Sequence, residues 1–177
     1  MEKKEFWNLI EAAKAEAQGN QQLQQEALIK QLEQLEPEHI VRFECILREY
    51  LVGADHFNII AAQKIIDGYV SDDSYLYFRC WLIGQGEAVF TNTLRDPDSL
   101  VSVIQDPYQD FEELLDVATT AFEQRTGKTA EDETSPRNVA EAQGLDYDLD
   151  SETKGEDWVE EKLPKMLPKL WKKFGAV

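Results

Sequence analysis

Four polar side chains that could bind a ligand or carry acid–base chemistry lie within or beside an otherwise apolar stretch, residues 67–86. They are Asp72, Asp73, Arg79 and Gln85. Between residues 75 and 83, Arg79 is the one charged residue among aromatic and branched apolar residues. A helix that is apolar nearly all round belongs in the interior of a domain. The pattern therefore predicts a central helix that carries a guanidinium into the core.

A buried guanidinium is costly unless a carboxylate neutralises it, so the stretch has two interpretations. In the first, Arg79 forms a buried ion pair that fixes the register of the helix. Asp72 lies two turns away, about 10 Å along the helix, so the expected partners are Asp73, Asp67 or Glu44. In the second, Arg79 binds a small anionic ligand, and the two aspartates and Gln85 supply further polar contacts. The ion pair is the favoured interpretation, and the ligand site is the alternative.

A second group of acids has the spacing of a calcium-binding loop. Asp146, Asp148, Asp150 and Asp157 correspond to the first, third, fifth and twelfth positions of such a loop. However, Ser151 occupies the position that needs glycine, and Asp157 is shorter than the usual bidentate glutamate. The sequence therefore favours a solvated acidic linker. The four aspartates stay weak candidates for metal ligands, and we expect no cofactor.

Residues that could act in covalent catalysis are present, but not in the pairs that catalysis needs. His39 and His56 each lie near an expected helix start, and neither has a Cys or Ser beside it as an activated nucleophile would need. Cys45 and Cys80 lie in apolar helical stretches, which favours buried thiols in a reducing compartment. The sequence contains no phosphate-binding loop, zinc-ligand spacing or dinucleotide fingerprint. These patterns favour a protein that is not an enzyme.

Residues 158–177 are amphipathic, with a basic face and with Trp158, Trp171 and Phe174 as aromatic anchors. Pro164 and Pro168 each remove a backbone donor, so two short helical turns are expected instead of one continuous helix on a membrane surface. We expect this segment to pack on the acidic body of its own chain. Docking on another protein or on a second copy is the alternative, in which the three aromatic residues would bind the partner.

The net charge of −17 over 177 residues limits the partners of the chain. It repels nucleic-acid phosphates and anionic lipid, so we expect a protein partner with a basic surface, no nucleic acid and no membrane association. The first residues form no apolar leader and no stretch could span a bilayer, which favours a cytoplasmic location. The oligomeric state is left open.

Helical periodicity runs through the first 127 residues, and no segment alternates with the period of a strand. Helices are expected over about 6–17, 23–35, 38–51, 55–67, 71–84, 87–95 and 111–122, and after Asp96-Pro97, Asp106-Pro107 and Ser135-Pro136. We therefore predict an all-α fold. It comprises an irregular, orthogonal bundle of about six helices over 1–127, an acidic linker over 128–157, and the segment 158–177 docked on the bundle.

Three stretches of the chain resemble the bacterial family known as domain of unknown function 4240. The first contains Ser71, Asp72 and Asp73, followed by Phe78-Arg79, Trp81-Leu82-Ile83 and Gln85-Gly86. The others are Phe6 to Ile10 and Leu94 to Leu100. The resemblance covers the first 125 residues or so. It implies a helical bacterial module, and it implies no activity, cofactor or site residue.

Two functional hypotheses of different class follow. The first is a non-enzymatic interaction or regulatory module whose acidic surface meets a basic partner. The second is a small-ligand or enzymatic site formed by Asp72, Asp73, Arg79 and Gln85. An exposed pocket at Arg79 would favour the second hypothesis, and side chains sealed in the core would favour the first.

Overall fold

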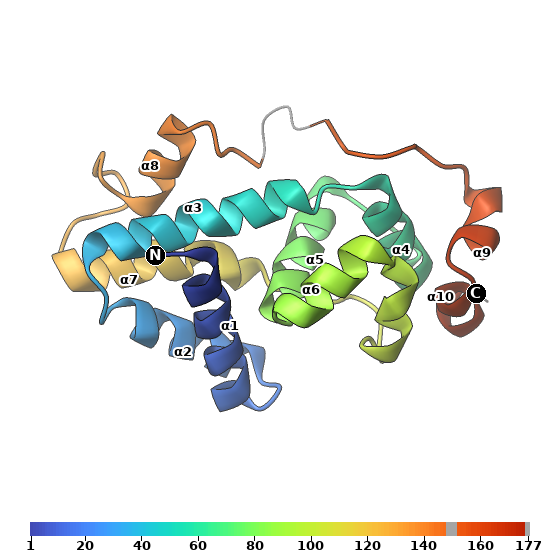
Figure 1. Cartoon of the computed structure of the whole chain (residues 1–177), viewed down its shortest axis with the longest axis horizontal. Helices are drawn as coiled ribbons and strands as arrows, with labels where there is room; N and C mark the ends of the chain where they lie inside the picture. Colours follow the sequence, from blue (N-terminus) through green and yellow to red (C-terminus); the bar gives the residue numbers. More distant parts are fainter. Residues whose placement is uncertain (148–151, 176–177) are drawn as a thin grey trace.

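The computed structural model describes residues 1–147 and 152–175, and it confirms the predicted all-α fold (Figure 1). In these ranges the only strand-like pairing is one isolated bridge between His56 and Lys154. The α-helices are α1 (Lys3–Ala17), α2 (Gln21–Leu32), α3 (Pro37–Gly53), α4 (Phe57–Asp67), α5 (Asp72–Gly84), α6 (Glu87–Arg95), α7 (Val117–Thr126), α8 (Pro136–Ala142), α9 (Leu163–Met166) and α10 (Pro168–Phe174). Shorter 3-10 helices are η1 (Pro97–Ser102), η2 (Glu112–Asp116) and η3 (Glu160–Lys162).

The long helix α3 joins the two halves of the molecule (Figure 1). In one half, α1 and α2 form a hairpin, α7 packs against α2 and α3, and α8 lies on the outer side of α3. In the other half, α4, α5 and α6 surround the far end of α3. Because α5 contacts both α1 and α3, it holds the two halves together.

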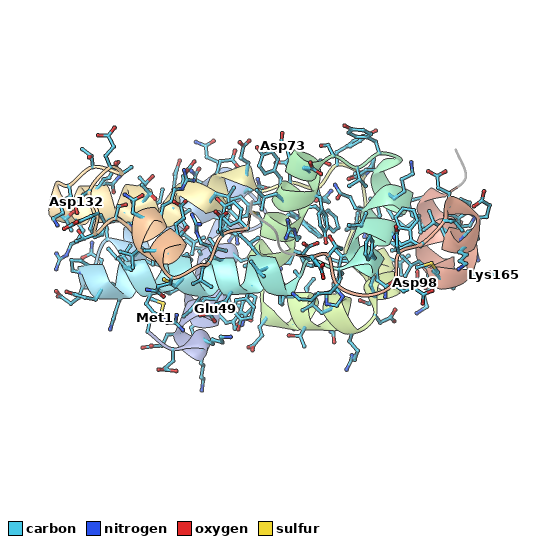
Figure 2. The ribbon with its side chains drawn as sticks, turned by 90° about the horizontal axis from the view of Figure 1, so that it is seen from above. Met1, Glu49, Asp73, Asp98, Asp132 and Lys165 are labelled. Atoms are coloured by element: carbon cyan, nitrogen blue, oxygen red, sulfur yellow. The ribbon has the colours of Figure 1, made fainter. Side chains whose placement is uncertain are left out.

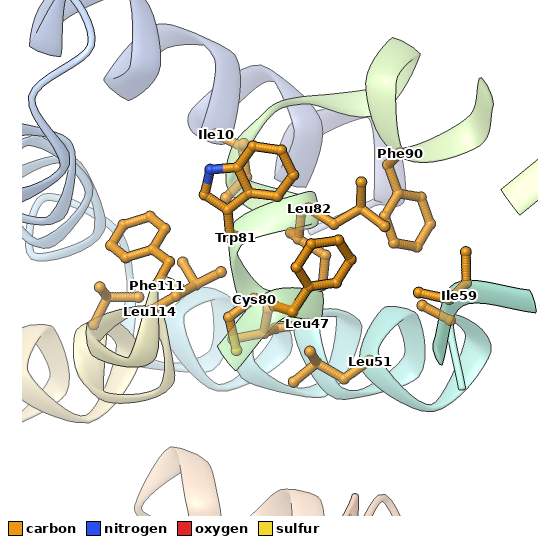
Figure 3. Close-up of a cluster of buried hydrophobic side chains, with 14 of the residues drawn as sticks. Ile10, Leu47, Leu51, Ile59, Cys80, Trp81, Leu82, Phe90, Phe111 and Leu114 are labelled. Atoms are coloured by element: carbon orange, nitrogen blue, oxygen red, sulfur yellow. The ribbon is translucent and has the colours of Figure 1, made fainter. Parts of the chain in front are cut away.

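The apolar core is continuous across both halves. Leu47 and Leu51 of α3, Leu82 of α5 and Ile10 of α1 are buried in it, and Phe90 of α6 closes one side (Figure 3). Burial of this kind contributes about 25 cal/mol for each Å² of apolar surface removed from water. The core therefore fixes where α5 lies, and α5 carries the polar residues of interest.

The two Asp-Pro pairs behave differently, so one helix prediction is confirmed and one is wrong. Asp96 caps η1 by accepting a hydrogen bond from the amide of Asp98, and Pro97 is the first helical residue. No helix follows Pro107, because Tyr108 has a left-handed backbone (φ 63°) and its amide donates to Asp67 at 2.7 Å. The same dipeptide thus starts a helix only where the next residues can adopt helical angles.

The expected helix over 111–122 is split into η2 and α7. The amide of Phe111 donates to the carbonyl of Tyr77 on α5 at 3.2 Å, which ties the chain to α5 at this point. The ring of Phe111 also lies on Gly84, where an added Cβ would come within 2.8 Å of the ring. These contacts with α5 hold Phe111 outside helical geometry (φ −154°, ψ 57°), and the α-helix starts only at Val117.

The described C-terminal residues 152–175 end at the far end of the molecule, where α10 contacts α4 and η1 (Figure 1). Pro164 lies in the first turn of α9 and Pro168 starts α10, as expected for prolines that end one turn and begin the next. Leu163, Leu167 and Leu170 are buried against the body. The division of the chain into a bundle, a linker and a terminal segment stays a prediction.

Candidate functional site

The N-terminal end of α5 presents two acids to solvent. Ser71 caps the helix: its hydroxyl accepts from the amide of Ser74 at 3.2 Å, and the hydroxyl of Ser74 accepts from the amide of Ser71 at 2.9 Å. Asp72 and Asp73 therefore lie in the first turn, where the positive end of the helix dipole stabilises negative charge. Both side chains are exposed, and Figure 2 shows Asp73 at the outer edge of α5.

Arg79 is buried, as predicted, with 5% of the residue exposed, but its expected carboxylate partner is not found among the described residues. Its Nη1 donates to the carbonyl of Leu51 at 2.9 Å, and its guanidinium lies 4.4 Å from the centre of the Tyr75 ring. Leu51 is in the last turn of α3, where backbone carbonyls have no partner within the helix and the dipole is negative. The end of α3 and an aromatic face therefore provide the negative potential that the sequence led us to expect from an acid.

The C-terminal end of α5 belongs to a different part of the surface. Gln85 is half-buried just beyond the helix, and its carbonyl accepts from Nζ of Lys14 at 2.8 Å. The 13 residues of α5 separate it from Ser71, which places Asp72 and Gln85 about 20 Å apart along the helix. Asp72, Asp73, Arg79 and Gln85 therefore do not converge on one pocket in the described part of the chain. The ligand site that combines these four residues stays a hypothesis.

A buried ion pair does exist, but on α3. Nε of Arg48 donates to Glu44 at 2.7 Å, and both side chains are at most 2% exposed. Nη1 of Arg48 donates to the carbonyl of Leu145 at 3.0 Å. Burial raises the pKa of the Glu44 carboxyl, and the charge of Arg48 opposes that shift. We did not predict this pair, although the i, i+4 spacing of an acid and a base on the apolar face of α3 was a visible signal.

The candidate calcium ligands are only partly described. Asp148 and Asp150 lie outside the described residues. Asp146 is half-buried, and Asp157 is exposed and accepts from the amide of Trp158 at 2.7 Å. Residues 1–147 and 152–175 contain no group of three or more His, Cys, Asp or Glu that could hold a metal ion. Calcium binding by the full set of four aspartates stays a hypothesis.

The three aromatic residues proposed as partner-binding residues all contact the chain itself. Trp158 is half-buried, and its Nε1 donates to the carbonyl of Phe57 at 2.7 Å. Trp171 and Phe174 are half-buried and pack against the core cluster. A partner would reach most of this apolar surface only after the segment had left the body.

One buried aspartate organises the docking of α10. Both carboxylate oxygens of Asp98 accept amide hydrogens from the start of α10, at 3.0 Å from Lys169 and 2.8 Å from Leu170. At the other end of α10, Nζ of Lys173 donates to the carbonyls of Val101 and Ile104 at 3.3 and 2.6 Å. The positive start of α10 thus lies on an acid, and its basic last turn lies on two carbonyls, one in the last turn of η1 and one just after it.

The two histidines and the two cysteines form no metal-binding group among the described residues, and the cysteines form no disulfide. His39 is exposed, and His56 is half-buried before α4. Cys45 and Cys80 are buried free thiols, as predicted. Burial raises the pKa of both thiols, which disfavours the reactive thiolate.

A strip of exposed acids, which we did not predict from the sequence, runs beside α5. We define this acidic strip as Asp72, Asp73, Asp110, Glu112, Glu113 and Asp116. α5 and η2 are in contact, and the hydroxyl of Tyr77 donates to Glu112 at 2.8 Å, so the two acidic segments adjoin. None of the six acids belongs to an ion pair among the described residues. The sequence did contain a signal for an unpaired acidic surface, because residues 65–78 and 96–124 contain no Lys or Arg.

Fold and surface together define an all-α protein with a sealed core and an unpaired acidic strip. A family model described as protein of unknown function (DUF4240) matches residues 1–124. The chain therefore belongs to this family, and the resemblance found in the sequence is confirmed. No curated protein and no solved structure gives a match. None of the described helices has both the length and the apolar character needed to cross a bilayer.

Proposed function

We propose that the chain is a non-enzymatic interaction or regulatory module of the bacterial cytoplasm, and that its acidic strip binds a protein with a basic surface. The observation that carries the proposal is the set of six exposed acids that have no ion-pair partner in the described part of the chain. Unpaired charge of one sign on one side attracts complementary charge and speeds association. The same charge repels phosphates, so the partner is a protein and not a nucleic acid.

The buried polar groups support this proposal over the alternative of an anionic ligand or substrate at α5. Arg79 already donates to Leu51 and lies on the Tyr75 ring, and it is almost fully buried. An anion would have to open the core to reach it. The acids of the strip, in contrast, can meet a partner without any change in the fold.

The test uses two variants of the same net charge. The strip variant carries Asp73→Asn, Asp110→Asn and Glu112→Gln, and the matched control carries Glu16→Gln, Glu38→Gln and Glu87→Gln at exposed acids outside the strip. Calorimetry with an oligolysine peptide at low salt should show weaker binding for the strip variant than for the control. Equal affinities for both variants would mean that only net charge matters, and the strip would not be the binding surface.

A further inference from the structure

A polar hollow of about 320 Å³ lies at the C-terminal end of α5, and its lining residue Gln21 donates to Glu113 of the acidic strip at 3.3 Å. It is bounded by the end of α1, the start of α2, the end of α5 and the chain after η1. Five glutamines line it, namely Gln21, Gln24, Gln85, Gln105 and Gln109, together with Trp81. We call it the glutamine hollow. Its volume is at the lower end of the range of small-molecule sites, about 300–1,000 Å³.

Two glycines place the residues of α5 at this hollow. Gly84 lets the Phe111 ring lie directly on α5, since any Cβ there would be 2.8 Å from that ring. Gly86 has a left-handed backbone (φ 97°), which ends α5 and starts α6 at once. Gln85 is therefore held at the mouth of the hollow, with its backbone fixed by Lys14.

Two nearly buried side chains bring unpaired polar atoms to the hollow. Trp81 is 7% exposed, and its indole N–H has no acceptor among the described residues. Figure 3 shows the indole nitrogen turned away from the apolar side chains of Cys80 and Leu47. Gln24 is 6% exposed; its Nε2 donates to the carbonyl of Gly84 at 2.8 Å, and no described donor reaches its Oε1. Neither atom is among the fully buried side-chain atoms that lack a partner, so both reach solvent and are open to a ligand that enters the hollow.

The lining chemistry selects the kind of molecule. Each glutamine amide both donates and accepts hydrogen bonds, as each hydroxyl group does. Lys14 and Asp106 are the two charged residues of the lining, one of each sign, so neither an anion nor a cation is favoured. The indole ring and the side chains of Val103 and Ile104 add apolar surface for C–H groups. An apolar molecule would leave the amides unpaired.

We propose that the glutamine hollow binds a small neutral sugar or sugar-like polyol. Trp81 Nε1 donates to one hydroxyl, Gln24 Oε1 accepts from another, and the amide of Gln85 binds a third. The lining residues run from Lys14 to Gln109, all within the residues matched by the family model. None of the lining residues belongs to the acidic strip.

The test follows the indole N–H of Trp81 in a two-dimensional proton–nitrogen NMR spectrum, with the signal assigned from the Trp81→Phe variant. The probes are glucose, galactose, maltose, trehalose and inositol, with glucose 6-phosphate and adenosine as contrasts. At least one neutral sugar or polyol should shift the Trp81 signal saturably, and neither contrast should bind more tightly.

Gln85→Ala, which removes a half-buried side chain, should weaken that binding about five- to thirtyfold, since it deletes one or two hydrogen bonds. The control Gln34→Ala, on an exposed residue outside the hollow, should bind as the parent does. If Gln85→Ala does not fold, Gln109→Ala, at another glutamine of the lining, replaces it and should likewise weaken the binding. The proposal fails if no neutral probe moves the Trp81 signal up to its solubility, if glucose 6-phosphate or adenosine binds more tightly, or if the Gln85 variant binds unchanged.

Discussion

Two buried guanidiniums in this protein are neutralised in different ways. Arg48 has a carboxylate, Glu44, whereas Arg79 has the carbonyl end of α3 and the ring of Tyr75. A helix C-terminus carries the equivalent of about half a negative charge, and a hydrogen bond from a charged donor contributes about 1.5–3 kcal/mol. A backbone terminus can therefore replace an acid when it is fixed in the core.

Replacing one partner of the Glu44–Arg48 pair should lower the free energy of unfolding strongly, whereas replacing both partners by apolar residues should lower it little. Arg48→Met leaves the Glu44 carboxylate buried without its cation, and we expect a loss of about 3–5 kcal/mol in the free energy of unfolding. Glu44→Leu combined with Arg48→Met should recover most of that loss, because no charge stays buried. Urea unfolding of the single and double variants measures both values. A loss below about 1 kcal/mol for Arg48→Met would show that the pair is unimportant.

The ion pairs at Glu49 should produce a measurable pH dependence. Partial burial would raise the pKa of Glu49, but hydrogen bonds from Lys3 and Arg42 outweigh it, and the pKa is lowered. A carboxyl with a lowered folded pKa stabilises the fold above its unfolded pKa of about 4.3, and this contribution is lost as the pH falls through the folded value. Glu49→Gln should therefore cost about 0.2–1 kcal/mol at neutral pH and nothing in acid.

Urea midpoints at neutral and acidic pH measure that difference. Glu16→Gln, at an exposed acid that has no ion pair among the described residues, should show no such change with pH. A Glu49→Gln difference that persisted or grew in acid would contradict the assignment.

At the scale of elements, the docking of α10 depends on η1. Asp98 accepts from the amides of Lys169 and Leu170 at the start of α10, and Lys173 donates to the carbonyls of Val101, in η1, and Ile104, just after it. α10 has seven residues, and isolated helices of that length are unstable in water. The body must therefore hold α10 in its helical form.

Asp98→Ala should release α10 from the body. The variant removes the cap from two amides, and we expect a loss of about 0.5–2 kcal/mol, concentrated in residues 163–175. Hydrogen exchange should show faster exchange in α10 while α3 and α5 keep their protection. Glu161→Ala, at an exposed acid of the same segment, is the control and should change neither. Unchanged protection of α10 in Asp98→Ala would rule out this role for Asp98.

Local signals in the sequence predicted most of the helices. The helices expected after Asp96-Pro97 and Ser135-Pro136 begin at Pro97 and Pro136, and Ser71 and Gly127 cap α5 and α7 within one helical turn. The failures came from contacts distant in sequence. The helix expected after Pro107 is absent because Tyr108 is bound to Asp67, 41 residues away.

At the candidate site, too, local sequence signals gave correct predictions and contacts distant in sequence did not. The burial of Arg79 followed from its apolar neighbours, but its acceptor lies 28 residues away at the end of another helix. The glutamine hollow could not be predicted, since its glutamines come from separate segments that meet only in the fold. Part of the acidic strip could be predicted, because two stretches of the sequence lack basic residues. That these stretches adjoin could not, because the contact between Tyr77 and Glu112 forms only in the tertiary structure.

At the scale of the whole molecule, a sealed interior contrasts with an open acidic surface. The Arg79 and Glu44–Arg48 groups are neutralised within the fold, whereas the six acids of the strip have no cationic partner in the described residues. Like charges held close together oppose folding, so an unpaired strip lowers stability unless a partner covers it. A basic partner would relieve that repulsion on binding.

Affinity capture from a lysate of the source organism at low salt is the decisive test of the acidic strip as a binding surface. The bait is the full chain, compared with the strip variant and with the matched control of equal net charge. We expect a protein with a basic surface that the chain and the control retain, that the strip variant loses, and that salt releases. A partner retained equally by both variants, or no partner for any bait, would contradict the proposed function.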